Sequence, residues 1–245
     1  MISPTRRGLL LAALILVGWS GSWALLGLSA TTSPAPLLVL AVLARTVLQT
    51  GLFIVGHDAM HGVLLPGRPR LNHRLGALAL LLYAVLPYGA CRAKHRRHHH
   101  APGSPRDPDF HAPGRPALIG WYGRFLSGYL RPGRLALLVG AWALLALATS
   151  VGSVLLLAVL PLLLSSLQLF LVGTVLPHRG PHPADDRHRA ISLPLPPWLS
   201  LLACYHFGYH REHHAFPELA WHQLPACRPQ QPRGRRLLAA PIGAR

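Results

Sequence analysis

LALLVGAWALLALATSVGSVLLLAVLPLLLSSLQLFLVGTVL, residues Leu135–Leu176, is the long apolar run from which the architecture of this chain can be predicted. None of its 42 residues is charged. A single helix of this length would measure about 63 Å, roughly twice the thickness of the hydrocarbon core of a bilayer. Because small and polar residues interrupt the stretch at Thr149–Ser153, we predict that it forms a hairpin of two transmembrane helices.

Two earlier stretches, Leu9–Ala30 and Ala35–Val55, are also apolar and long enough to span a membrane. A further apolar stretch, Leu75–Ala90, has only 16 residues, so we expect it to lie at the membrane interface instead of crossing. Arg6 and Arg7 before the first stretch could mark a secretory signal peptide. The first stretch is longer than the apolar part of such a peptide, which favours a retained anchor.

These stretches predict an all-α integral membrane protein with four transmembrane helices in two hairpins, an interfacial helix and a cytosolic, histidine-rich cap. A hydrophobic content of 51% agrees with a bilayer environment. We expect residues 1–227 to form one membrane domain. Residues 228–245 are rich in Pro, Gly and Arg and are expected to form a basic, disordered tail.

The charge of the chain is unbalanced, with 24 Lys and Arg against 7 Asp and Glu. Two tight connections, Thr31–Pro34 and Thr149–Ser153, contain no Lys or Arg, whereas every cation except Arg45 falls in the segments on the opposite side. The positive-inside rule then predicts that both termini and all large loops are cytoplasmic. Cations arranged between membrane spans in this way do not indicate nucleic-acid binding. Arg45, near the middle of the second span, either turns inward to a polar partner or makes a functional contact.

Sixteen histidines are the unusual feature of the composition. His57 and His61 follow the second span without a break, and a spacing of four puts both imidazoles on one face of a helix. The pattern H-x-x-H-H occurs at 95–99 and again at 210–214, and in a helix the first histidine of each copy lies beside the other two. The candidate metal ligands on the cytoplasmic side are therefore His57, His61, His95, His98, His99, His210, His213 and His214. The three cysteines have no metal-type spacing and support neither a zinc ribbon nor a disulfide framework.

Eight imidazoles exceed the four to six ligands of one first-row metal ion, so we predict two metal ions. His178, just after the last span, is a further candidate ligand, and His206, four residues before His210, is the least certain one, with a supporting role as the alternative. Metal-bound imidazoles usually donate their second N–H to a carboxylate or carbonyl. Four acids in or beside the boxes are candidates for this supporting role: Asp58, Asp107, Asp109 and Glu212. A capping or ion-pair role stays open for Asp107 and Asp109.

Taken together, these motifs resemble the membrane fatty-acid desaturase/hydroxylase superfamily, whose signature is one box of two histidines followed by two H-x-x-H-H boxes around a di-iron centre. Within it, the sequence looks like the bacterial-type β-carotene 4-ketolases. The stretches that carry the likeness are 56–62 (GHDAMHG), 95–110, 176–179 (LPHR) and 204–214 (CYHFGYHREHH), and the likeness covers residues 46–225.

The resemblance implies two iron ions, O₂ as co-substrate, a ferredoxin-like electron donor and β-carotene taken from the lipid bilayer. The implied product has a keto group at C4 of the β-ionone ring, as in echinenone and canthaxanthin. No separate catalytic acid or base is expected beyond the metal centre. Apolar residues beside the boxes are expected to line the substrate channel: Met60, Phe110, Tyr205, Phe207 and Tyr209.

Alternatives remain at this stage. A carotenoid ring hydroxylase or a fatty-acyl desaturase could use the same metal core, and the related hydroxylases carry Ser where Met60 stands. A membrane metal transporter is a non-enzymatic alternative. It is disfavoured because the histidines gather at one face of the membrane instead of following a path through it.

Overall fold

Three long helices form the body of the computed structural model, which describes residues 3–28, 31–109, 117–178, 182 and 185–228. Helix α1 (Pro4–Gly21) continues as a 3₁₀ helix (Ser22–Gly27), and α2 is Ala35–His61. The third helix runs from Val151 to Val175 and includes α7 (Val151–Val154), α8 (Leu160–Phe170) and two π-helical segments, Leu155–Val159 and Leu171–Val175. The segments Thr5–Gly27, Ala35–His61 and Val151–Val175, with 23, 27 and 25 residues, are long and apolar enough to cross a membrane.

Two bent helix pairs complete the apolar part of the chain. The chain bends by 100° between α3 (Pro69–Ala84) and α4 (Tyr88–His100). It bends by 87° between α5 (Leu118–Tyr129) and α6 (Pro132–Ala148). Each bend lies next to a proline, Pro87 or Pro132, which cannot donate a backbone hydrogen bond inside a helix. The apolar residues 75–90, predicted as one interfacial helix, therefore fall on both sides of the first bend.

The predicted all-helical fold is confirmed, and so is the break in the long apolar run, because α6 ends at Ala148 and α7 begins at Val151. Within the described ranges there is no β-strand, only an isolated bridge between Ser192 and Tyr209. The count of four spans stays a prediction. Helix α6 has 17 residues and is bent sharply against α5, so by itself it is shorter than the three long helices.

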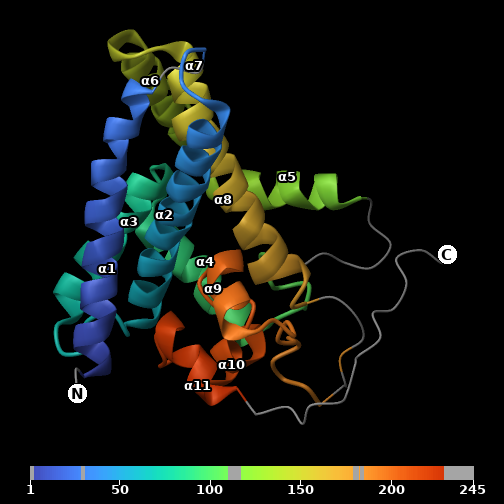
Figure 1. Ribbon diagram of the computed structural model, residues 1–245. Helices are drawn as coiled ribbons and strands as arrows, with labels where there is room; N and C mark the ends of the chain where they lie inside the picture. Colours follow the sequence, from blue (N-terminus) through green and yellow to red (C-terminus); the bar gives the residue numbers. More distant parts are fainter. Residues whose placement is uncertain (1–2, 29–30, 110–116, 179–181, 183–184, 229–245) are drawn as a thin grey trace.

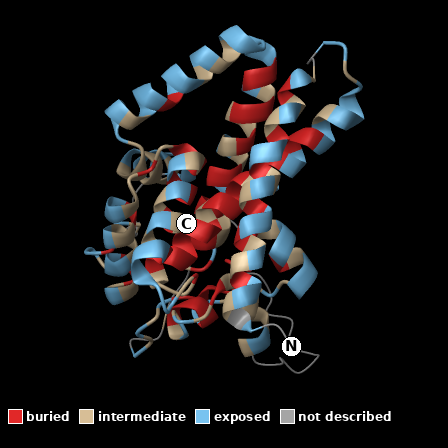
Figure 2. Ribbon diagram, turned by 90° about the vertical axis from the view of Figure 1, so that its left-hand side faces the viewer, coloured by how far each residue is buried: buried red, intermediate tan, exposed pale blue. Residues whose placement is uncertain are grey.

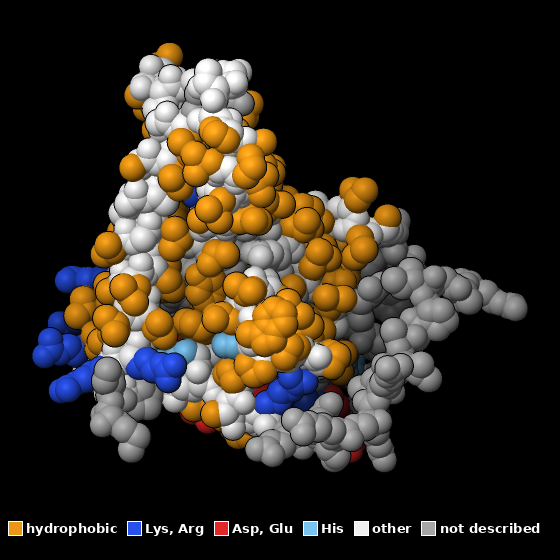
Figure 3. Space-filling model, in the orientation of Figure 1, with side chains coloured by type: hydrophobic (Ala, Val, Ile, Leu, Met, Phe, Trp, Pro, Cys, Tyr) orange, Lys and Arg blue, Asp and Glu red, His pale blue; other side chains and the backbone are white. Residues whose placement is uncertain are grey.

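Short helices gather at one end of the long bundle, beside α4 (Figure 1). They are α9 (Pro197–Cys204), α10 (His210–Ala215), a 3₁₀ turn (Trp221–Gln223) and α11 (Leu224–Cys227). The start of α1 lies at this end, and the tight connections α1–α2 and α6–α7 lie at the other end, where Ser153 donates a hydrogen bond to the Leu28 carbonyl at 2.8 Å. Most Lys and Arg side chains visible in Figure 3 lie toward the end with the short helices.

Helix α2 lies at the centre of the fold and packs closely on α3. A Cβ atom added at Gly76 would lie 2.5 Å from the Ala59 side chain, and one at Gly56 would lie 2.6 Å from Leu80. Only glycine permits this approach. The outward faces of the long helices are apolar and exposed, with Val17 71% and Leu40 64% exposed, as expected of surfaces in contact with lipid (Figure 2).

Arg45 turns inward. Its side chain is 2% exposed, donates a hydrogen bond to Ser22 Oγ at 2.7 Å, and lies with its guanidinium carbon 4.2 Å from the centre of the Trp23 ring. Both partners belong to the 3₁₀ continuation of α1. Of the two roles considered for this arginine, the inward polar partner is the one observed.

Candidate metal centre

Eight histidines come together in two groups of four at the capped end of the bundle. Site A consists of His57, His61, His95 and His213, and site B consists of His98, His178, His210 and His214. In each site the four ring nitrogens that could bind a metal lie within 4.8 Å of one another. The sequence boxes are thus divided between the sites: α4 and α10 each contribute histidines to both, α2 contributes two to site A, and the segment after the third long helix contributes His178 to site B.

The ring nitrogens within these sites face one another. The Nε2 atoms of His61 and His95 are 2.7 Å apart, and the Nε2 atom of His214 lies 3.1 Å from those of both His98 and His210. The Nε2 atoms of His57 and His178 are buried without a hydrogen-bond partner. Buried polar atoms normally have a partner, so converging imidazoles with unpaired nitrogens fit a metal ion as the shared partner.

His99 lies between the two sites. Its Nε2 atom is 3.1 Å from His95 Nε2 and 2.9 Å from His213 Nε2, both of site A, while its ring stacks on that of His214 of site B at 4.2 Å. His99 therefore faces site A with its nitrogen and site B with its ring. It is a ninth imidazole in contact with both groups.

Hydrogen bonds orient two imidazoles of site B. His98 donates through Nδ1 to Asp107 Oδ2 at 2.9 Å, and His178 donates through Nδ1 to the Arg189 carbonyl at 2.7 Å. In the neutral form of each ring the remaining Nε2 then carries no proton and is directed toward the site. Burial by itself raises the pKa of the Asp107 carboxyl. The hydrogen bond and charge interaction with His98, together with hydrogen bonds from the backbone N–H groups of Asp109 and Gly103, nevertheless hold that pKa below its usual value.

The other predicted supporting acids lie in different surroundings. Asp58 Oδ1 is 3.7 Å from His57 Nδ1, too long for a hydrogen bond, and Asp58 Oδ2 accepts a 3.4 Å bond from the Trp221 N–H. Glu212 is buried and accepts a hydrogen bond from Ser192. The Asp109 carboxylate is hydrogen-bonded by Tyr129, not by a histidine.

The imidazoles of α10 are held in the neutral form that binds metals. Burial lowers the pKa values of His210, His213 and His214 well below the ordinary value, and repulsion from neighbouring histidines lowers them further. A site of buried neutral imidazoles with few acids suits a borderline transition metal such as iron or zinc better than magnesium or calcium.

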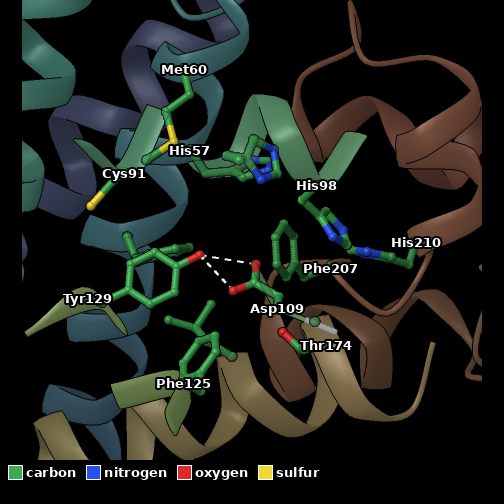
Figure 4. A pocket seen from close by; sticks show the side chains of 14 residues that line it. His57, Met60, Cys91, His98, Asp109, Phe125, Tyr129, Thr174, Phe207 and His210 are labelled. Atoms are coloured by element: carbon green, nitrogen blue, oxygen red, sulfur yellow. Dashed lines mark hydrogen bonds between the residues drawn. The ribbon is translucent and has the colours of Figure 1, made fainter. Parts of the chain in front are cut away.

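A small chamber of about 30 Å³ lies against both sites. Its wall combines His57 and His95 of site A with His98 and His210 of site B, as Figure 4 shows for the labelled residues. The rest of the wall is mainly apolar and includes Phe53, Met60, Phe125, Leu169 and Phe207. The Phe207 ring lies edge-on to His57, with the ring centres 4.7 Å apart.

A much larger apolar groove of about 560 Å³ adjoins the chamber between α3, α5, α6 and the third long helix. The two cavities share Phe53, Phe125, Tyr129 and Leu169. Residues of the groove wall such as Leu163 reach the lipid-facing surface, where Leu163 is 50% exposed. The groove therefore lies next to the chamber at the histidine sites, and the side chains that line both cavities stand between them.

Comparison with known proteins agrees with this geometry. The family model of fatty acid desaturases matches residues 32–136 and 128–237. The chain belongs to the fatty acid desaturase family. Among curated relatives, a Beta-carotene ketolase of Paracoccus sp. (strain PC1) is 45% identical over 198 residues, which cover 79% of this chain and 80% of that protein. A Beta-carotene 4-ketolase 3 of Haematococcus lacustris is 39% identical and a Zeaxanthin 4-ketolase of Chlamydomonas reinhardtii is 40% identical, with 76% and 74% of this chain covered and 61% and 42% of theirs.

For this desaturase-family chain, several residues predicted from the sequence lie elsewhere. His206 belongs to neither site and stacks on Tyr209 and Trp221. Tyr205 and Tyr209 do not line the chamber, because their hydroxyls bond the carbonyls of Val47 and Leu195. Met60 and Phe207 do line it, and Phe110 lies outside the described residues.

The sequence did not predict the contribution of α5 to the chamber. Phe125 and Tyr129 line it from this helix, four residues apart and therefore on one face. The aromatic spacing of the segment from Trp121 to Tyr129 was the available signal. It carries no histidine, and nothing in its pattern indicates which surface it covers.

Proposed function

We propose that this chain is a carotenoid 4-ketolase that holds one iron ion in site A and one in site B. It introduces a keto group at C4 of the β-ionone ring of β-carotene, giving echinenone and canthaxanthin. The observation that carries the proposal is the pair of four-histidine sites facing an apolar chamber. The substrate class comes from the relatives, whose names include β-carotene and zeaxanthin 4-ketolases.

When bound, the irons supply the redox chemistry by which O₂ and two electrons replace a C–H bond with a C–OH group. The protein orients the histidines and surrounds the site with apolar side chains. Asp107 and the Arg189 carbonyl hold His98 and His178 with Nε2 directed inward. The aromatic and aliphatic wall of the chamber excludes water from a reaction that water would quench.

The groove supports a long apolar substrate. Its wall is almost entirely apolar, and it adjoins a chamber with the space of only a water molecule or two. An end ring therefore reaches the metal sites from the groove, by displacing side chains at the shared wall. Phe125 and Tyr129 lie at this junction and would move against the entering ring.

A ketone requires two oxygenations at one carbon. Each consumes one O₂, two electrons and two protons; one oxygen atom enters the C–H bond as a hydroxyl and the other leaves as water. The first oxygenation gives an alcohol, and the second gives a geminal diol. The diol loses water to become the ketone.

A ferredoxin-like protein is proposed as the electron donor. Arg96, Arg97 and Arg211 are exposed beside the histidine sites, on α4 and α10. An acidic donor would be steered to such a cationic face, and the same cations suit contact with anionic lipid. We further propose a multi-pass membrane location in which both termini and the histidine sites are cytoplasmic, as the positive-inside rule indicates.

Expression in β-carotene-producing cells tests the proposal directly. A ketolase gives pigments with a ketone at C4 and a red-shifted absorption, whereas a ring hydroxylase gives alcohols and an acyl desaturase alters lipid chains. The purified protein is expected to hold about two iron ions per chain. Zinc in place of iron, together with unchanged pigments and metal uptake by cells, would instead indicate a transporter.

A further inference from the structure

One carboxylate interrupts the chamber wall. Among the described residues that line the chamber, Asp109 is the only acid. Its Oδ1 and Oδ2 atoms lie 3.1 and 3.0 Å from the Tyr129 hydroxyl, which donates to them (Figure 4). Apart from the histidines the chamber wall is mainly apolar, and a carboxylate in such surroundings is costly unless it has a task there.

The backbone of Asp109 is fixed on both sides. Its N–H donates to Asp107 Oδ1 at 2.9 Å, and its carbonyl accepts from Trp121 Nε1 at 3.1 Å. Trp121 and Tyr129 both belong to α5, so this helix holds the carboxylate and its backbone together. The acid is therefore positioned firmly, and its direction is set by Tyr129.

The carboxylate keeps capacity for another donor. A phenol has one proton to donate, whereas a carboxylate has about four lone-pair positions. Lys94, the nearby cation, instead donates to the Gly128 carbonyl and lies 4.4 Å above the Tyr129 ring. Within the described part of the chain, the hydrogen bonds to this carboxylate come from Tyr129 alone.

The position of the pair matches the path of a substrate. The oxygen of Asp109 lies within 4.8 Å of a ligand nitrogen of His98, which belongs to site B. Tyr129 lines both the chamber and the groove. A ring carbon that enters from the groove toward the metal sites passes the wall that Tyr129 shares between the two cavities, and Asp109 lines the chamber beyond it.

An alcohol made in the chamber has a particular difficulty. Its new O–H lies in a chamber whose wall, apart from the histidines, is mainly apolar, and an unpaired hydroxyl there is unfavourable and drives the molecule back toward water or the lipid interface. The parent carotenoid has no such group. A partner for the hydroxyl would thus act only on the half-oxidised molecule.

We propose that the Asp109 carboxylate, oriented by Tyr129, accepts a hydrogen bond from the 4-hydroxyl of the half-oxidised carotenoid and holds it for the second oxygenation. This rests on the proposed function and deepens it, because it explains why a ketone is made instead of an alcohol. The ketone has no O–H to donate, so loss of water from the diol removes the attraction and favours release of the product.

The test compares two substrates on the iron-loaded protein in lipid nanodiscs: the unoxygenated carotenoid and its 4-hydroxy derivative. For Asp109→Asn, kcat/KM with the alcohol is expected to fall about tenfold further than with the parent, mainly through KM, because a hydrogen bond to a charged acceptor is replaced by one to a neutral acceptor. Tyr129→Phe is expected to shift the same ratio in the same direction by a smaller factor. In cells, both variants should release more alcohol relative to ketone.

Tyr122→Phe is the matched control, because it removes a tyrosine hydroxyl of α5 that bonds Ser166 and lines neither cavity. Its alcohol-to-parent ratio should equal that of the wild type. An equal fall with both substrates in Asp109→Asn would overturn the inference, and so would loss of iron, which would make Asp109 a metal ligand. Absence of ketone from the iron-loaded wild type would overturn the proposed function as well, so the two failures are distinct.

Discussion

Sites A and B each contain four imidazoles, but the imidazoles of the two sites are held in place in different ways. In site B, His98 and His178 each donate a hydrogen bond to a fixed acceptor, Asp107 or the Arg189 carbonyl. In site A, both ring nitrogens of His57 are buried and unpaired, and the nearest carboxylate, Asp58, is 3.7 Å away. Site A is therefore ordered by helix geometry and packing, whereas two of the four imidazoles of site B are also held by hydrogen bonds.

The difference follows from where the ligands come from. His57 and His61 stand one turn apart on α2, so the helix alone aligns their rings. His178 comes after the last long helix, in an irregular segment whose backbone does not fix the ring. A histidine on such a segment needs an acceptor to set its tautomer and direction.

The largest expected effect separates the two sites. His213→Ala removes a ligand from site A and His214→Ala removes one from site B, so each variant should lose about one of two irons and at least about a hundredfold of ketone formation, since both metals serve one reaction. Iron analysis and pigment analysis measure this. His100→Ala, outside both sites, should keep both irons. Full iron and turnover in His213→Ala would refute the metal centre.

A second pair of variants tests how the imidazoles are oriented. Asp107→Asn weakens the acceptor of His98, so site B should bind iron about 10- to 100-fold more weakly. Asp58→Asn should change site A by less than about threefold, because Asp58 makes no hydrogen bond to His57. Competition with a chelator measures both affinities. Equal losses in the two variants would remove the distinction between the sites.

The smallest expected effect concerns packing against site A. A Cβ at Gly173 would lie 2.4 Å from the Phe207 ring, which is centred 4.7 Å from His57 and 5.6 Å from His210. Gly173→Ala should lower the free energy of unfolding by about 1–3 kcal/mol and weaken site A more than site B. Thermal unfolding in detergent and iron titration check this.

Gly140→Ala is the control for that variant, because a Cβ there meets nothing within 4 Å. It should be neutral or slightly stabilising, as alanine favours a helix over glycine. If Gly173→Ala and Gly140→Ala had the same effect on stability, the Phe207 ring could move to make room for the added methyl group, and the close packing would not constrain site A.

Helix periodicity explains how much of the site was predictable. Spacings of three and four within α2, α4 and α10 indicated which rings share a face, and the structure brings those rings together. The division into two sites was not predictable, because each H-x-x-H-H box gives ligands to both. That division depends on how the helices cross, which no local spacing encodes.

Loop geometry and aromatic surfaces account for the rest. His206 precedes His210 by four residues, a spacing that would put both rings on one face of a helix. The backbone of His206 is left-handed, with φ 61°, and α10 begins only at His210, so these two histidines do not share a helix. No sequence pattern near Tyr129 indicates its role, because its hydrogen-bond partner, Asp109, lies 20 residues earlier in the chain. The apolar runs predicted the three long helices, and Pro87 and Pro132 mark where the bent pairs are interrupted, but the angle of each bend depends on how the helices pack.

Arg45 has a consequence for how the chain enters a membrane. A cation in the middle of a single inserting helix costs about 2.5–3.5 kcal/mol, and the partners that offset this cost, Ser22 and Trp23, lie on the preceding helical segment. Insertion of helix α2 is therefore expected to be more favourable beside α1 than by itself, so the biogenesis of this protein should favour joint insertion of the first two helices.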